Sequence, residues 1–295
     1  MRPKIPGLIL GVFIISLARR EFAPKGGSAP LTRLAMGVCM MVGAMMFIGC
    51  PTTMLLRLAR GEMNAIFGLV GFTAGIFAGM FFLNKGFTLK RTYSISKSDG
   101  LVLPIISVLL LVALLAFPAL LNFSEAGFAS FRAPVVASLI GGLLIGGLAF
   151  ISRFCTVAAI RDSIFFKSFS MLAAFIGFLA VLAGYNLVFG HFDLGFEAQP
   201  FAHTNILSMG LVGFVASLVG GCPFRQIVLA GSGNSDAAVT VLGMTFGAAL
   251  IHNLGLASNM QGPSDRGPIG FVIAATVAVG VAAYNTFFRT PAQVK

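Results

Sequence analysis

Long apolar stretches, each separated from the next by a short polar segment, run through this sequence from end to end. A helix needs about 20 mostly apolar residues to cross a bilayer. About nine stretches approach or reach that length, at residues 5–18, 31–50, 63–83, 101–122, 134–151, 167–190, 204–221, 236–254 and 267–287. Because lipid admits only helices and closed barrels as spanning structures, the pattern predicts an all-α polytopic membrane protein.

The composition excludes a soluble or nucleic-acid-binding class. The chain is 57% hydrophobic and 10% charged, whereas a soluble domain carries roughly 25% charged residues. Its net charge of +11 comes from Lys and Arg residues that lie between the apolar stretches, as in membrane proteins. No small-residue cleavage site follows 5–18, so we interpret it as a retained helix rather than a signal peptide. We expect one transmembrane domain over residues 1–295.

The positions of the Lys and Arg residues predict which side of the membrane each loop faces. If the N-terminus is outside, most of these residues fall in inner loops, and the outer side keeps Arg2, Lys4, Arg57, Arg60, Arg132 and Arg266. The loop from His191 to His203, which would be outer, holds Asp193 and Glu197 and no Lys or Arg. The bias of basic residues towards the cytoplasm therefore favours an outer N-terminus and a cytoplasmic C-terminus.

Two segments of the chain are copies of each other at an offset of 172 residues, with no gap. The first is GCPTTMLLRLARGEMNAIFGLVGFTAG, from Gly49 to Gly75, and the second is GCPFRQIVLAGSGNSDAAVTVLGMTFG, from Gly221 to Gly247. An odd number of predicted spans separates them, so they should enter the membrane from opposite faces. We therefore predict an inverted repeat with halves at about 1–130 and 131–295, and inverted repeats place substrate sites near the bilayer midplane.

Each copy also predicts a helix that is broken inside the membrane. The apolar run after Pro51 is only about ten residues long, which is too short to span. Proline ends the helix before it and suits the first turn of the next helix. We expect a helix ending at Gly-Cys, a short half-helix, a glycine-rich turn and then a full span. Such non-helical backbone needs surrounding protein or a water-filled cavity.

The cysteines are the first candidate site residues. Cys50 and Cys222 would lie at the starts of half-helices, whose free N–H groups attract anions. They could instead be small buried residues at tight turns, but the duplication of the whole Gly-Cys-Pro unit favours a functional role. Cys155 lies near Arg153 and Arg161 in a predicted inner loop, and is either a third site thiol or a plain loop cysteine.

In each copy, the half-helix, the turn and the following span form a helical hairpin. The polar residues of these two hairpins are the second group of candidates. Ionisable groups at membrane depth are costly and usually functional, although these could also be interfacial. Glu62 and Asp236 could hold loops by pairing with an arginine or by capping the next helix. The substrate path is predicted from Cys50, Cys222, Cys155, Arg57, Arg60, Arg225, Gly49, Gly221, Asn234 and Asp236.

Nothing in the sequence predicts a metal, a cofactor or ATP-driven chemistry. His191, His203 and His252 do not have the spacing of metal ligands, and no phosphate-binding loop with its lysine is present. Cys39 lies within an apolar run and is expected to be a buried thiol that packs like a small hydrophobic residue. We expect a protein that is not an enzyme and needs no cofactor.

Motifs spread over nearly the whole chain are similar to those of one known family. They are REFAPKGGSAPLTR at 20–33, GCPTTMLLRLARGEMNA at 49–65, LNKGFTLKRTYSISKSDG at 83–100, RFCTVAAIRD at 153–162, FDLGFEAQPFAHT at 192–204 and GGCPFRQIVLAGSGNSDAAVTVLGM at 220–244. They resemble the YeeE/YedE family, also called the sulfur-transport family, and most of all its YedE-like branch of selenium transporters.

The resemblance implies a bacterial inner-membrane permease for a small sulfur- or selenium-containing anion. Relatives import thiosulfate along a cysteine-lined path by weak S–H···S contacts, and Cys50, Cys155 and Cys222 match the family's cysteine motifs. A soluble sulfur carrier of the TusA/SirA type is the implied partner at the inner face. Thiosulfate-type relatives carry a cysteine after the first helix, where this chain reads SLARREF, so a selenium-containing anion or another small sulfur oxyanion fits as well as thiosulfate.

Two other functions remain open at the level of sequence. One is a membrane-embedded relay enzyme in which a persulfidated cysteine hands sulfur or selenium to a carrier, which needs a reactive thiol. The other is a non-selective channel for small solutes, whose conduction would not depend on the cysteines.

Overall fold

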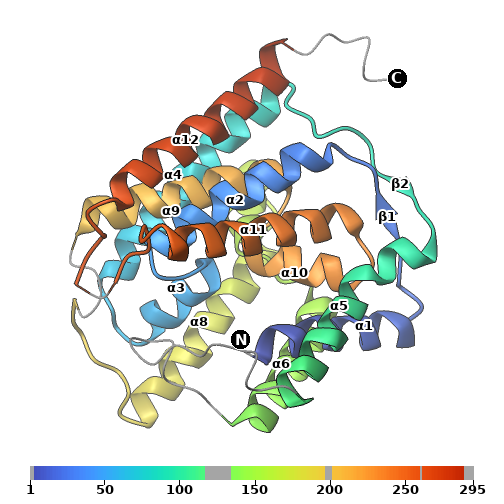
Figure 1. The fold of residues 1–295 in the computed structure, drawn as a ribbon. Helices are drawn as coiled ribbons and strands as arrows, with labels where there is room; N and C mark the ends of the chain where they lie inside the picture. Colours follow the sequence, from blue (N-terminus) through green and yellow to red (C-terminus); the bar gives the residue numbers. More distant parts are fainter. Residues whose placement is uncertain (1–2, 117–133, 197–200, 260, 289–295) are drawn as a thin grey trace. The chain divides into compact units, whose positions relative to one another are not determined.

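The computed structural model describes residues 3–116, 134–196, 201–259 and 261–288, and these are mostly helical with almost no sheet (Figure 1). The predicted all-α class is therefore confirmed. The helices are α1 (Lys4–Ala18), α2 (Pro30–Met46), α3 (Pro51–Ala59), α4 (Asn64–Asn84), α5 (Lys97–Ala116), α6 (Val135–Ser152), α7 (Thr156–Phe165), α8 (Ser170–Val188), α9 (Ala202–Val219), α10 (Pro223–Gly231), α11 (Ser235–Asn253), α12 (Gly267–Ala283) and the π-helix η3 (Tyr284–Phe288). Two short strands, β1 (Lys25–Gly26) and β2 (Tyr93–Ser94), pair antiparallel.

Eight helical segments of the described chain are long and apolar enough to cross a membrane. They account for the predicted stretches except the first, because α1 is apolar but has only 15 residues. The end of the predicted span 101–122 and the predicted boundary between the repeat halves at 130/131 lie outside the described residues, as do Arg2, Arg132 and Glu197. The division into repeat halves stays a prediction.

Three of the eight segments are broken helices, each with a half-helix after the break. The half-helices are α3, α7 and α10, which follow α2, α6 and α9 within single apolar segments. The bounds of α3, Pro51–Ala59, and of α10, Pro223–Gly231, differ by the same 172 residues as the sequence copies. The half-helices predicted from Gly-Cys-Pro are therefore confirmed.

The third half-helix corrects the sequence analysis, which placed Cys155 and the residues after it in an inner loop. Residues Thr156–Phe165 form the helix α7. The chain breaks because Arg153 adopts a left-handed conformation (φ 54°) and Cys155 is extended (φ −151°, ψ 121°). The adjacent charges Arg161 and Asp162 indicated a loop, but they pair with each other at 2.7 Å between Nε and Oδ1.

The chain forms two compact units, each made of separate segments. The first unit comprises residues 1–28, 91–153 and 225–238, and the second comprises 29–90, 154–224 and 239–295. In the first unit, α1 packs closely on α6 through glycines. A methyl group at Gly11 would overlap the carbonyl of Leu143, and one at Gly146 would overlap that of Leu8. Such small residues let helices approach where burial from water supplies no driving force.

In the second unit, the two copies pack on each other reciprocally. Gly71 of α4 lies against the carbonyl oxygen of Ile206 on α9, and its equivalent, Gly243 of α11, lies against that of Leu34 on α2. Leu34 and Ile206 are themselves equivalent at the repeat offset. Reciprocal contacts of this kind are the mark of a two-fold relation between copies.

The direction of α4 follows from its contacts with α9. Gly71 faces Ile206, and one turn later Gly75 faces Gly210. The residue numbers rise together along both helices, so α4 and α9 run parallel.

The helix α2 runs the other way. A methyl group at Gly43 would lie 2.7 Å from the carbonyl oxygen of Ser208, part of the way along α9. Just past the end of α2, the Phe47 ring packs against Gly68, near the start of α4 and therefore near the start of α9. As the residue numbers rise along α2, its contacts move towards the start of α9. The helix α2 and its copy α9 are therefore antiparallel. An operation that relates the two copies must reverse the direction of the chain, as in an inverted repeat.

Candidate functional site

A cysteine stands at each of the three breaks. Cys50 precedes Pro51 with extended backbone (φ −85°, ψ 171°), Cys155 precedes Thr156, and Cys222 directly precedes α10. The first N–H groups of a helix have no partner within the helix. Each thiol therefore lies where a half-helix presents free donors and the positive end of its dipole. The sequence predicted this arrangement for two of the three cysteines.

Cys155 and Cys222 lie together in the second unit. The Cys155 sulfur is within hydrogen-bonding reach of the Cys222 thiol and its backbone N–H, and it faces the N–H groups of Val157 and Ala158 in the first turn of α7. Both cysteines are buried, with 6% and 0% of their surface exposed. Two soft sulfur atoms and several backbone donors therefore share one buried place.

Cys50 is less buried than the other two and has a different neighbour. Its thiol contacts the hydroxyl of Thr53 at 3.5 Å, within its own half-helix. The half-helix α3 nevertheless lies beside α7, because Leu55, Ala159 and Phe175 form one core cluster that joins α3, α7 and α8. The half-helices that begin at Cys50 and Cys155 thus pack into the same core.

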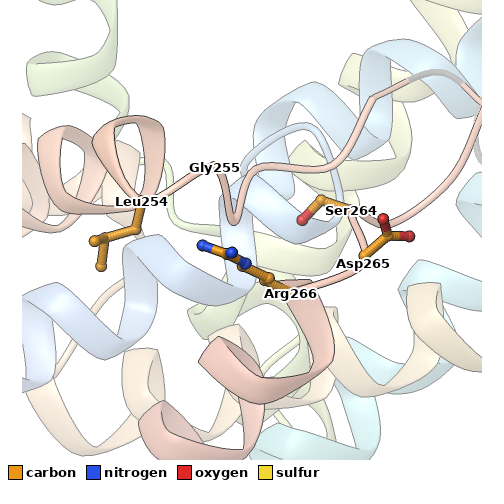
Figure 2. A pocket seen from close by; sticks show the side chains of 5 residues that line it. All are labelled: Leu254, Gly255, Ser264, Asp265 and Arg266. Carbon is orange, nitrogen blue, oxygen red and sulfur yellow. The ribbon is translucent and has the colours of Figure 1, made fainter.

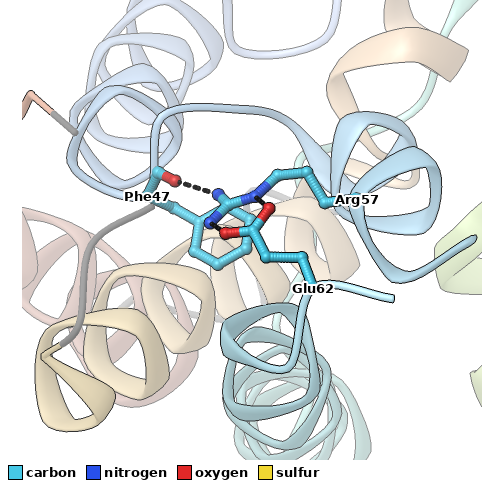
Figure 3. Close-up of polar contacts among 3 residues, drawn as sticks. All are labelled: Phe47, Arg57 and Glu62. Atoms are coloured by element: carbon cyan, nitrogen blue, oxygen red, sulfur yellow. Dashed lines mark hydrogen bonds and ion pairs between the residues drawn. The ribbon is translucent and has the colours of Figure 1, made fainter. Parts of the chain in front are cut away.

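Arg57 connects the turn of the first hairpin with the end of α2 through hydrogen bonds to Glu62 and Phe47 (Figure 3). Its guanidinium donates to both carboxylate oxygens of Glu62, at 2.7 and 2.5 Å, and to the carbonyl oxygen of Phe47 at 2.8 Å. It also lies over the Phe47 ring, 4.5 Å from the centroid. The side chains of Arg57 and Glu62 are only 12% and 11% exposed. The predicted pairing of Glu62 with an arginine is observed, and these contacts give Arg57 a structural role; its place on the path stays a prediction.

The turn between α3 and α4 is held by the segment that follows α8. The backbone N–H of Asp193 donates to the carbonyl of Arg60 at 2.9 Å, and that of Met63 donates to the carbonyl of Gly195 at 3.0 Å. Gly61 adopts a φ of +94°, and a side chain there would lie 2.6 Å from the carbonyl oxygen of Asp193. The Arg60 side chain is exposed. The turn therefore depends on glycine and on a segment that is distant in sequence.

The second hairpin anchors the N-terminal segment of the first unit. The Asp236 carboxylate, 4% exposed, accepts hydrogen bonds from the N–H groups of Gly27 and Ser28 at 3.0 and 3.1 Å and from the Ser28 hydroxyl at 2.6 Å. Asn234 accepts from the N–H of Ala237 at 3.0 Å and so caps α11. Asp236 and Asn234 thus have clear structural contacts. Asp236 holds a loop through Gly27 and Ser28, partners that the sequence did not predict.

Three predicted site residues remain, namely Gly49, Gly221 and Arg225. The N–H groups of Gly49 and Gly221 close the ends of α2 and α9 in the same way, donating to Ala44 and Ala216 at 2.8 Å each. Arg225 lies on α10 and is partly exposed.

A separate pocket lies at the other end of α11, between that helix and α12 (Figure 2). Its lining is Leu254, Gly255, Ser264, Asp265 and Arg266. The Arg266 side chain extends towards the turn at Leu254 and Gly255, whereas Asp265 points away from it. With one basic and one acidic group at its rim, this pocket has no clear preference for an anion, in contrast to the place that Cys155 and Cys222 share.

Comparison with known proteins bears on the half of the chain that contains α7 to α12. Residues 151–288 match the family model described as sulphur transport. A search of curated proteins finds no match. The matched region includes both Cys155 and Cys222. The resemblance inferred from the motifs is confirmed for the family, whereas the selenium branch stays a prediction.

Proposed function

We propose that this chain, a member of the sulphur-transport family by its residues 151–288, imports a small sulfur- or selenium-containing anion through the bacterial plasma membrane. The observation that carries the proposal is the shared position of the Cys155 and Cys222 thiols at the start of α7. Membrane-spanning helices and the family match support transport in general. The thiols support a soft anion in particular.

The chemistry of this place suits an anion that has one soft atom. Backbone N–H groups at a helix start favour negative charge, and sulfur atoms are polarisable and make weak S–H hydrogen bonds. An anion such as thiosulfate would place its terminal sulfur against the two thiols and its charge against the N–H groups of Val157 and Ala158. A hard anion such as phosphate would use only the second set of contacts.

The hydrogen bonds of the two hairpin turns are consistent with the predicted sides of the loops. The turn after α3 is bonded to residues 193–195, in the predicted outer loop, and the turn after α10 is bonded to residues 23–25, in a predicted inner loop. We therefore propose an outer N-terminus and a cytoplasmic C-terminus. Arg60, which is exposed at the first turn, would attract the anion, and Arg57 would belong to the scaffold because Glu62 already compensates its charge.

The proposed transport changes no covalent bond in the substrate, so the protein would not act as an enzyme. A soluble sulfur-carrier protein of the TusA/SirA type would meet the cytoplasmic face of the protein. This partner is part of the proposal because relatives of the family often work with such a carrier.

Uptake by purified protein in proteoliposomes tests the proposal. We expect uptake of radiolabelled thiosulfate, with competition by selenite or sulfite reporting the preferred element. Cys155→Ser and Cys222→Ser should each lower uptake by about tenfold, which corresponds to about 1.4 kcal/mol, because each removes one soft contact. Cys39→Ser, which changes a buried thiol on α2, is the matched control and should transport normally.

Three results would contradict the proposal. The wild-type protein could fail to move any of these anions, or both cysteine variants could transport normally. Alternatively, mass spectrometry could find one additional sulfur atom on Cys155 or Cys222 after exposure to substrate, which would indicate the relay enzyme.

A further inference from the structure

Thr156, the residue directly after Cys155, carries a buried hydroxyl group at the start of α7. It is the first residue of α7, and none of its surface is exposed. Its Oγ1 has no hydrogen-bond partner among the described residues. A buried polar atom without a partner costs free energy, and in a native protein it calls for a functional or structural explanation.

The break in the helix explains why this hydroxyl lacks the usual partner. A threonine inside a helix normally donates to the carbonyl four residues earlier, as Thr73 does to Leu69 at 2.8 Å and Thr245 does to Val241 at 2.9 Å. Four residues before Thr156 the chain is still in α6, before the break. The Thr156 hydroxyl therefore lacks the carbonyl partner that a threonine inside a helix normally has four residues earlier.

The hydroxyl lies at the same end of α7 as the thiols. Side chains on a helix tilt towards its N-terminus, and Thr156 follows Cys155 directly. The Cys155 sulfur faces the N–H groups of Val157 and Ala158 and the thiol of Cys222. One end of one helix thus combines soft sulfur atoms, backbone donors and a hydroxyl whose hydrogen is available.

We propose that the Thr156 hydroxyl donates a hydrogen bond to an oxygen atom of the transported anion while Cys155 and Cys222 contact its sulfur or selenium. This inference rests on the proposed function and adds a residue that sets specificity. Thr156 would select a soft anion that carries oxygen, such as thiosulfate, over hydrosulfide or hydroselenide, which have no oxygen to accept the bond.

The variant Thr156→Val tests this, because valine keeps the shape of the side chain and loses only the hydroxyl. Without substrate, the variant should unfold in detergent at the same temperature as the wild type or a higher one, because an unpaired polar atom has been removed. In proteoliposomes, thiosulfate uptake should fall by about tenfold, and hydrosulfide uptake should be unchanged. Thr156→Ser, which restores the hydroxyl, should recover thiosulfate uptake.

Thr73→Val is the matched control, because the Thr73 hydroxyl already has a partner in Leu69. Its unfolding temperature should fall and its thiosulfate uptake should stay normal. Thr156→Val should instead keep or raise the unfolding temperature and lower thiosulfate uptake. If Thr156→Val destabilises the protein and lowers the uptake of both anions equally, the role of Thr156 is structural and the inference is wrong.

The failure of this inference can be told apart from failure of the proposed function. If the wild type imports thiosulfate and Thr156→Val does so at the same rate, only the inference is overturned. If the wild type prefers hydrosulfide to thiosulfate, the inference is also overturned while transport of a soft anion stands. If the wild type moves none of thiosulfate, selenite, sulfite and hydrosulfide, both are overturned.

Discussion

The two hairpins of the repeat share a backbone and differ in their side-chain chemistry. α3 and α10 begin after the same Cys-Pro pair and have equal lengths. In the first hairpin, Arg57 and Glu62 form a buried ion pair. At the equivalent positions the second hairpin has Leu229 and Asn234, and Asn234 caps α11 instead.

The thiols of the two hairpins differ in the same way. Cys50 is partly exposed and contacts Thr53 in its own half-helix, whereas Cys222 is fully buried and meets Cys155 from another broken helix. The Cys50 thiol thus contacts a residue of its own half-helix, whereas the Cys222 thiol contacts a different segment. Duplication preserved the break in the helix, and what surrounds each break has diverged.

Removing one partner of the ion pair should have the largest effect. Glu62→Asn leaves the Arg57 guanidinium buried without its carboxylate, and breaking a buried pair in this way costs about 3–5 kcal/mol. Thermal unfolding in detergent would measure the loss.

The double variant Arg57→Leu, Glu62→Asn gives the first hairpin the residues of the second and should recover most of that stability, because no unpaired charge remains. Normal uptake by the double variant would place Arg57 in the scaffold. Lost uptake from a stable double variant would show instead that Arg57 lies on the path.

The reciprocal helix contacts predict a smaller, unequal pair of effects. A methyl group at Gly75 would overlap the backbone carbonyl of Gly210, whereas one at the equivalent Gly247 would lie 3.0 Å from Val38 Cα. Gly75→Ala should therefore destabilise by about 1–3 kcal/mol, the usual cost of overpacking, and Gly247→Ala by less. Equal unfolding temperatures for the two variants would refute the asymmetry between the α4–α9 and α2–α11 contacts.

Asp236→Asn should have the smallest effect of the three. The second hairpin has Asp236 where the first has Asn64, and its two oxygens accept three hydrogen bonds from Gly27 and Ser28. An amide has one acceptor oxygen, so about 1–2 kcal/mol should be lost with the charge-assisted bonds. Faster hydrogen exchange at the N–H groups of Gly27 and Ser28 would locate the loss, and unchanged exchange would show that the carboxylate does not hold this turn.

The sequence predicted the helical class, the broken helices of both copies and the pairing of Glu62, because each depends on local rules. Proline after cysteine ends one helix and starts another, and a carboxylate five residues after an arginine can turn back to it across a tight loop. These features needed no knowledge of the tertiary structure.

The sequence could not predict the third break or the meeting of Cys155 with Cys222. No proline marks Cys155, and the pair Arg161–Asp162 resembles a loop until the two charges are seen to neutralise each other. The contact between two cysteines 67 positions apart depends on how α7 packs against the end of α9. The buried hydroxyl of Thr156 was missed for the same reason, although its place directly after a cysteine that resembles a family motif was a usable signal.

Protection of individual thiols by substrate tests the central claim most directly. Purified protein in nanodiscs would be treated with methyl methanethiosulfonate, with and without thiosulfate or selenite, and the modification of each cysteine would be quantified by mass spectrometry. We predict that the transported anion slows the modification of Cys155 and Cys222 and leaves Cys39 unaffected. If no transported anion changes the rate at which Cys155 and Cys222 are modified, the claim that these thiols contact the substrate is contradicted.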